Sequence, residues 1–122
     1  MDIEIIPCLN DNYSYLLKDN QTDTVAIIDP SEFGPCDKKI NQKYKKLDFI
    51  LNTHHHFDHV GGNVELKKKY GSKILGFEKD KKRIPDIDTL LKDGQELKIG
   101  NLNVKTIFIP GHTSGHIAFY FE

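Results

Sequence analysis

The six histidines of this 122-residue chain fall in two short segments, and this clustering limits how the chain can fold. Four of them lie between residues 54 and 59, and the other two are His112 and His116. Histidines on a solvated surface would be scattered along the chain. Because clustered imidazoles indicate a shared chemical task, the fold is expected to bring together two segments that are half the chain apart.

The first segment lies just after Leu47 to Leu51, a short apolar run that predicts a strand buried on both faces. It therefore lies at the carboxyl end of a strand, where open α/β sheets bind ligands. Side-chain alternation places His54 and His56 on one side, and Asp58 and His59 follow one short turn later. Neutral imidazoles and a carboxylate at about 2 Å are the ligands that zinc prefers. These four side chains are therefore predicted metal ligands.

His112 is the fifth predicted ligand. It follows an apolar stretch that ends at Ile109, and Pro110 is expected to end that strand. Gly111 lets the backbone approach another part of the molecule closely. His112 is therefore expected to reach a metal ion held by the first segment.

Three neighbouring residues are expected to support the site rather than bind the metal. His55 points away from the histidines on either side of it and is interpreted as structural. His116 begins the last predicted strand and is interpreted as a packing or supporting residue, because metal ligands need partners that fix their tautomers. Thr53, which precedes the first segment, is assigned to the same supporting shell.

Helices and strands alternate along the chain and are mixed with hairpins. Ile40 and Tyr44, four residues apart with lysines around them, predict a helix over about 35–46, and Asn63 is the predicted N-cap of a second helix ending at Gly71. Gly100 and Asn101 predict a hairpin turn. Strands are expected at 3–7, 13–17, 24–28, 47–51, 73–76, 95–99, 102–109 and 116–121. This order predicts a single α/β domain over residues 1–122, with a mixed sheet and helices.

Charge and composition argue against several classes of protein. The 17 basic and 18 acidic residues leave a net charge of −1, which disfavours a dedicated nucleic-acid binder. The basic stretch 64–83 is interpreted as solvated helix and loop faces, with a guide surface for an anionic substrate as the alternative. No apolar run approaches the roughly 18 residues of a membrane helix. Acids at positions 2 and 4 disfavour a secretory signal, so a cytoplasmic location is expected. Cys8 and Cys36 are expected to be free thiols that pack as small apolar groups.

The two histidine segments resemble the signature of the metallo-β-lactamase superfamily. That signature is Thr-His-x-His-x-Asp-His, found here from Thr53 to His59, followed later by a Gly-His loop, found here at 111–112. Within the superfamily the chain is most similar to the glyoxalase II family of hydroxyacylglutathione hydrolases. The similarity includes residues 5–7, 11–13, 25–30, 50–63 and 110–118. It implies a layered αββα sandwich, of which this chain contains about the first half.

The resemblance assigns a role to each predicted ligand. His54, His56 and His112 correspond to the ligands of a first metal ion, and Asp58 and His59 to ligands of a second. The family's bridging carboxylate, a further histidine and the helical domain that holds glutathione lie beyond the last residue, so an incomplete domain is expected. Full-length relatives bind two Zn²⁺ ions. About one is expected here because two side chains alone bind a second ion weakly, and iron or manganese are alternative metals.

The implied reaction is hydrolysis of S-D-lactoylglutathione to D-lactate and glutathione, a step of methylglyoxal detoxification. Asp58 would orient the attacking metal-bound hydroxide and is the predicted catalytic residue. No substrate-binding residue is identified, and the isolated chain is expected to be weakly active. An uncovered sheet face is expected to promote self-association. Two alternatives remain: an iron-dependent, persulfide-oxidising member of the superfamily, and a remnant that binds metal without turnover.

Overall fold

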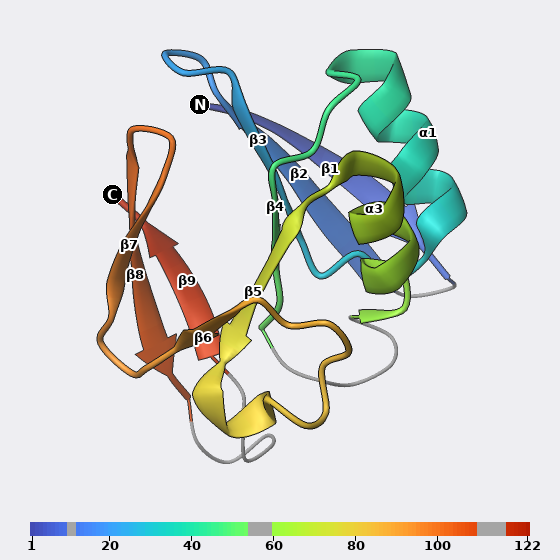
Figure 1. The fold of residues 1–122 in the computed structure, drawn as a ribbon. Coiled ribbons are helices and arrows are strands. Elements are labelled where there is room, and N and C mark those ends of the chain that lie inside the picture. The colour runs from blue at the N-terminus through green and yellow to red at the C-terminus, as the bar shows by residue number, and fades with distance from the viewer. Residues whose placement is uncertain (10–11, 54–59, 110–116) are drawn as a thin grey trace.

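The computed structural model describes residues 1–9, 12–53, 60–109 and 117–122, which form two β-sheets and two α-helices in layers. Helices α1 (Phe33–Lys43) and α3 (Asn63–Tyr70) cover one face of a larger sheet, and a smaller sheet covers part of the other face (Figure 1). The larger sheet has the order β1 (Asp2–Cys8), β2 (Asn12–Asp19), β3 (Thr24–Ile28), β4 (Phe49–Leu51), β5 (Lys73–Phe77) and β6 (Thr89–Leu91). The smaller sheet has the order β7 (Glu96–Ile99), β8 (Leu102–Phe108) and β9 (Ile117–Phe121).

The larger sheet is mixed, as the sequence predicted. Strands β1, β2 and β3 pair antiparallel, whereas β3, β4, β5 and β6 pair parallel. One apolar core lies between this sheet and the helices and includes Ile27, Ile50 and Leu66. A second core lies between the two sheets and includes Leu51 and Ile117. Side chains of adjacent residues on β4 thus enter different cores, which explains why the strand is apolar on both faces.

Both helices differ from the expected boundaries in small ways. Helix α1 begins before Pro35, which the first turn tolerates because the missing N–H would have no partner there, and Lys45 at φ +59° follows its end. Asn63 is not an N-cap, so that expectation was wrong: Gly62 holds the cap position, and Asn63 is buried as the first residue of α3. Gly71, at φ +70°, ends this helix as predicted. Among the helices that the structure describes, none is long and apolar enough to cross a membrane.

The hairpin predicted at Gly100 is present, and it also fixes one sheet against the other. Gly100 has φ +62°, and a Cβ atom there would lie 2.5 Å from Asp19 Oδ2 and would also meet Thr22 Oγ1. The backbone N–H of the next residue, Asn101, donates to the same Asp19 oxygen at 2.7 Å. The β7–β8 turn is therefore seated directly on the β2–β3 turn.

Replacing Gly100 with alanine is expected to lower the free energy of unfolding by about 2–4 kcal/mol, because the new methyl group is both strained and sterically blocked. Gly94→Ala is the matched control, since Gly94 has φ +79° but open space around it. This control isolates the backbone strain and is expected to cost about 1 kcal/mol. Urea denaturation of both variants measures the difference, and equal losses would show that the two turns do not touch.

An ion pair joins the two helices on the outer face of the molecule. Lys69 Nζ lies 2.7 Å from Asp37 Oδ1, and the Tyr70 hydroxyl donates to the same oxygen at 2.5 Å. Burial by itself would raise the pKa of Asp37, but the hydrogen bonds from Lys69 and Tyr70 lower it below its ordinary value. Ion pairs such as this one, and Lys67 with Asp88, support the interpretation of the basic stretch as a solvated surface.

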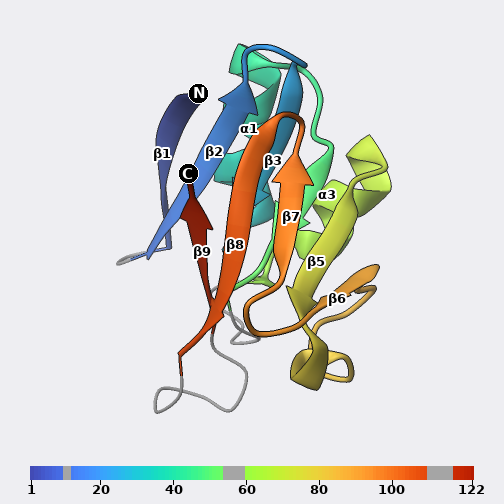
Figure 2. The same cartoon turned by 90° about the vertical axis from the view of Figure 1, so that its left-hand side faces the viewer.

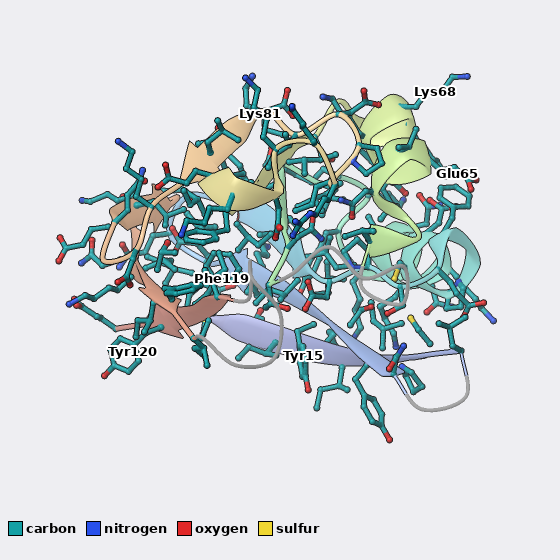
Figure 3. All side chains as sticks on the ribbon, turned by 90° about the horizontal axis from the view of Figure 1, so that it is seen from below. Tyr15, Glu65, Lys68, Lys81, Phe119 and Tyr120 are labelled. Atoms are coloured by element: carbon teal, nitrogen blue, oxygen red, sulfur yellow. The ribbon has the colours of Figure 1, made fainter. Side chains whose placement is uncertain are left out.

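The lowered pKa of Asp37 predicts a specific loss of stability in acid. A carboxyl group with a depressed folded-state pKa stabilises the fold above its unfolded pKa of about 4, and this contribution disappears as the pH falls through the folded-state value. Asp37→Asn is expected to cost about 1 kcal/mol at neutral pH and to flatten the decrease between about pH 4 and pH 2. Thermal denaturation across this range measures the effect. Glu65→Gln is the control, because Glu65 is exposed and lies, like Lys68, on the outer side of α3 (Figure 3). An unchanged acid profile in Asp37→Asn would contradict the prediction.

Candidate metal centre

The parallel strands β3, β4 and β5 bring three chain segments to one edge of the larger sheet. Ile28 is in register with Leu51, and Leu51 is in register with Leu75. The chain leaves β4 at this edge and runs through Asn52 and Thr53 into the first histidine segment, residues 54–59. This edge is the carboxyl end of the parallel strands, where α/β sheets bind ligands.

Asp29 holds the entrance to the first histidine segment. Its carboxylate accepts hydrogen bonds from the backbone N–H of Thr53 at 2.8 Å and from the Thr53 hydroxyl at 2.6 Å. Asp29 is buried, and its own N–H donates to the carbonyl oxygen of Leu51 at 2.9 Å. Its φ of +51° is a conformation that aspartate tolerates better than most residues. Two charge-assisted hydrogen bonds from one residue therefore fix Thr53 in position and orientation.

A buried pair of amide side chains joins the two sides of the same segment. The Asn63 side-chain amide donates to Asn52 Oδ1 at 2.6 Å, and the Asn52 amide donates to Asn63 Oδ1 at 3.3 Å. Asn52 directly follows β4, and Asn63 begins α3, so the pair spans the first histidine segment. Nearby, the N–H of Gly62 donates to the carbonyl oxygen of Pro30 at 2.7 Å. These hydrogen bonds hold the residues just before the first histidine segment close to the residues just after it.

The residues on either side of the second histidine segment, 110–116, lie close to the start of the first segment. Phe108 and Ile117 are cross-strand partners on β8 and β9. The N–H of Ile117 donates to the carbonyl oxygen of Thr53 at 2.8 Å, which links the smaller sheet to the entrance of the first segment. The Phe108 ring also stacks on Phe77 of β5, with 5.1 Å between ring centroids. The fold therefore brings the flanks of the two segments together, as a shared site would require.

All the predicted ligands lie outside the described residues: His54, His56, Asp58, His59 and His112. The same holds for His55 and His116, so their assigned roles remain predictions. Thr53 is described, and it lies between the Asp29 carboxylate and Ile117. Within the described part of the chain, no group of three or more histidine, cysteine, aspartate or glutamate side chains could hold a metal ion. The chemistry of the predicted donor set, imidazoles and one carboxylate, fits a divalent cation such as zinc.

Sequence reasoning missed Asp29 and the amide pair as parts of this site. From the sequence, no role is assigned to Asp29, and only a helix cap is predicted for Asn63. A usable signal was present, because Asp29 directly follows β3 and Asn52 directly follows β4. Polar residues at the carboxyl ends of adjacent parallel strands lie at one edge, beside the segment that carries the predicted ligands.

Comparison with known proteins defines the class of fold first. The structure is similar to BLEG-1, a B3 metallo-beta-lactamase, with a TM-score of 0.81 and 23% sequence identity over 98% of this chain and 67% of that one. The sequence of residues 9–122 matches the family model of the metallo-beta-lactamase superfamily. The chain therefore belongs to the metallo-beta-lactamase superfamily, as its histidine segments suggested.

Curated relatives show the resemblance within the superfamily. The chain is 53% identical over 121 residues to a hydroxyacylglutathione hydrolase of Pelagibacter ubique, and the match covers 99% of this chain and 51% of that protein. It is 46% identical to the hydroxyacylglutathione hydrolase of Methylococcus capsulatus, of which the match covers 48%. The similarity to the glyoxalase II family is thus confirmed. The chain spans about half the length of the curated relatives it matches.

Proposed function

We propose that this chain is the metal-binding half of a glutathione thioester hydrolase of the glyoxalase II type. The observation that carries this proposal is its 53% identity over 121 residues to a protein named hydroxyacylglutathione hydrolase. The substrate would be S-D-lactoylglutathione, and the products D-lactate and glutathione. A cytoplasmic location, as expected from the sequence, is part of the proposal.

Each predicted site residue has a separate task in this proposal. His54, His56 and His112 would hold one zinc ion, and Asp58 and His59 would contribute to a second, weakly held one. A bound zinc ion supplies Lewis acidity and lowers the pKa of water to about 7. Asp58 would orient the attacking water and accept a hydrogen bond from it. Asp29 would support these residues through Thr53, because the Asp29 carboxylate accepts hydrogen bonds from the Thr53 N–H and hydroxyl.

The test is hydrolysis of S-D-lactoylglutathione by the 122-residue chain loaded with one zinc per chain. The expected rate is low but above that of free zinc at the same concentration, and it is expected to fall to that background in Asp58→Ala. Thioester loss is followed by ultraviolet absorbance, and released thiol by a chromogenic disulfide. A rate equal to free zinc in the wild-type chain would contradict a catalytic role and favour a metal-binding remnant.

An uncovered apolar face predicts that copies of the chain associate with one another. Ile3, Ile5, Tyr13 and Tyr15 are 55%, 57%, 55% and 41% exposed, and they share the face of β1 and β2 that points toward the smaller sheet. Figure 2 shows β1 and part of β2 extending past β9, so the smaller sheet does not cover them. Contiguous exposed apolar surface of this kind favours association.

Sedimentation velocity is expected to show dimers or larger species whose share rises with protein concentration. Ile5→Lys is expected to shift the chain toward monomer, because the charge would have to be buried in the contact. Val64→Lys is the control, since Val64 is an exposed residue of α3 on the other side of the sheet. A wild-type chain that stays monomeric at all concentrations would contradict the prediction.

A further inference from the structure

The two cysteines, 28 residues apart in the sequence, lie side by side in the core. Cys8 is the last residue of β1, and Cys36 is the fourth residue of α1. Their Sγ atoms are 3.7 Å apart, and both side chains are buried, at 2% and 0% exposure. They are free thiols, as expected from the sequence. Their contact was not expected, and neither the proposed reaction nor the metal centre uses it.

We propose that Cys8 and Cys36 form a reversible intramolecular disulfide, with a low-molecular-weight disulfide such as glutathione disulfide as the oxidant. The two sulfur atoms would have to approach each other by roughly 1.6 Å to reach bonding distance. Rotation of the two short side chains about their χ1 bonds would have to provide this movement. This redox site would join the end of β1 covalently to the first turns of α1.

The reaction balances with one glutathione disulfide per protein chain. One cysteine thiolate attacks a sulfur of glutathione disulfide, and a glutathione thiolate leaves, which produces a mixed disulfide on the protein. The second cysteine, as its thiolate, then attacks the protein sulfur of this mixed disulfide and expels the second glutathione. Two protein thiols are oxidised, one glutathione disulfide is reduced to two glutathione molecules, and the protons of both cysteines pass to the released thiolates or to water.

Access to the buried thiols has a structural route. The N-terminus of α1 has no side-chain cap hydrogen bond and no acidic residue in its first turn, and Gly34 and Pro35 lie within it. β1 is one of the two edge strands of the larger sheet in the described part of the chain, and Cys8 is its last residue. Helix ends and edge strands open more readily than core elements. Burial raises the pKa of the Cys36 thiol to about 12, and this slows the reaction in the closed state without preventing it in the opened state.

Ser14 links the two cysteines to Asp29, the residue that holds Thr53 at the start of the first histidine segment. Cys8 Sγ contacts Ser14 Oγ at 3.4 Å, and the Ser14 hydroxyl donates to the carbonyl oxygen of Asp29 at 2.7 Å. The N–H of Ser31 donates to the same hydroxyl at 3.2 Å. Drawing Cys8 toward Cys36 therefore changes the surroundings of Ser14. The Ser31 amide resonance gives a readout of the disulfide in the folded protein.

The test is equilibration of the folded, metal-free chain in glutathione buffers of increasing oxidised fraction, followed by alkylation and peptide mapping by mass spectrometry. A peptide pair joined through Cys8 and Cys36 is expected in oxidising buffer. It should disappear on reduction, and the Ser31 amide resonance should shift between the two forms. At one buffer ratio, the disulfide-to-dithiol ratio is expected to be at least about ten-fold higher in the folded chain than in urea, because folding holds the sulfurs together.

Cys36→Ser and Cys8→Ser are the controls, and each is expected to stop at a mixed disulfide with glutathione. The wild-type comparison with and without urea decides the question even if one of these variants fails to fold. Recovery of both cysteines as free thiols, or only as separate glutathione adducts, in the folded wild-type chain would overturn the proposal. So would a disulfide that forms equally well in urea.

Discussion

Replacing His54 or His112 with alanine is expected to abolish tight zinc binding by this chain. Each imidazole is a predicted ligand of one open zinc site with three protein ligands, and loss of any one leaves two. Supporting partners alone change metal affinity by 10–100-fold, so removal of a direct ligand is expected to weaken it by more than about 100-fold. Metal analysis after exhaustive dialysis is expected to show about one zinc per wild-type chain and almost none in either variant.

His55→Ala provides the matched control, because it removes an imidazole from the same segment without removing a predicted ligand. It is expected to retain the wild-type zinc content. The comparison of His54→Ala with His112→Ala is the most informative part of this experiment, because the two residues belong to different histidine segments. Retention of zinc by His112→Ala, or two tightly held ions in the wild-type chain, would contradict the predicted ligand set.

Replacing Asp29 with asparagine is expected to weaken zinc binding by about 10–100-fold while the chain remains folded. Asp29 accepts two hydrogen bonds from Thr53, and a neutral amide has only one oxygen with which to accept them. Asparagine also tolerates the φ of +51° at this position, so the change does not add backbone strain. The predicted ligands would then be held less firmly. Competition with a chromogenic chelator measures the affinity.

Thr53→Val separates the two hydrogen bonds at nearly constant volume. It removes the hydroxyl donor and keeps the backbone N–H, so its zinc affinity is expected to lie between wild type and Asp29→Asn. Far-ultraviolet circular dichroism establishes that each variant is folded before its zinc affinity is compared. Wild-type zinc affinity in a folded Asp29→Asn chain would show that the hydrogen bonds between Asp29 and Thr53 have no influence on the metal centre.

The parts of the fold that could be predicted are those governed by local chemistry. Gly100 and Asn101 produced the expected hairpin, with Ile99 opposite Leu102. Gly71 ended its helix as expected, because only a residue that tolerates positive φ fits there. β6, with three residues at Thr89–Leu91, was missed, since so short a run has little periodicity of its own. Its pairing with β5 decides its structure.

The function of single polar residues was harder to predict than the elements that carry them. Asn63 has a residue type that favours the N-cap position, yet it is the first residue of α3 and its side chain is buried against Asn52. Local propensity favoured a cap, but a buried amide needs hydrogen-bond partners, and Asn52 at the end of β4 supplies them. The competing interaction comes from a residue 11 positions away, so no local pattern could reveal it.

The sequence by itself determined the candidate ligands, because metal coordination requires particular side chains and their spacing survives in the chain. It also determined the α/β class, since apolar periodicity and turn residues act over a few neighbouring positions. Only the tertiary structure decided that Asp29 holds Thr53, that Ile117 meets Thr53, and that Cys8 touches Cys36. These contacts join residues at least 24 positions apart, and they depend on strand register and on how the layers pack. Neither property is encoded at any single position of the chain.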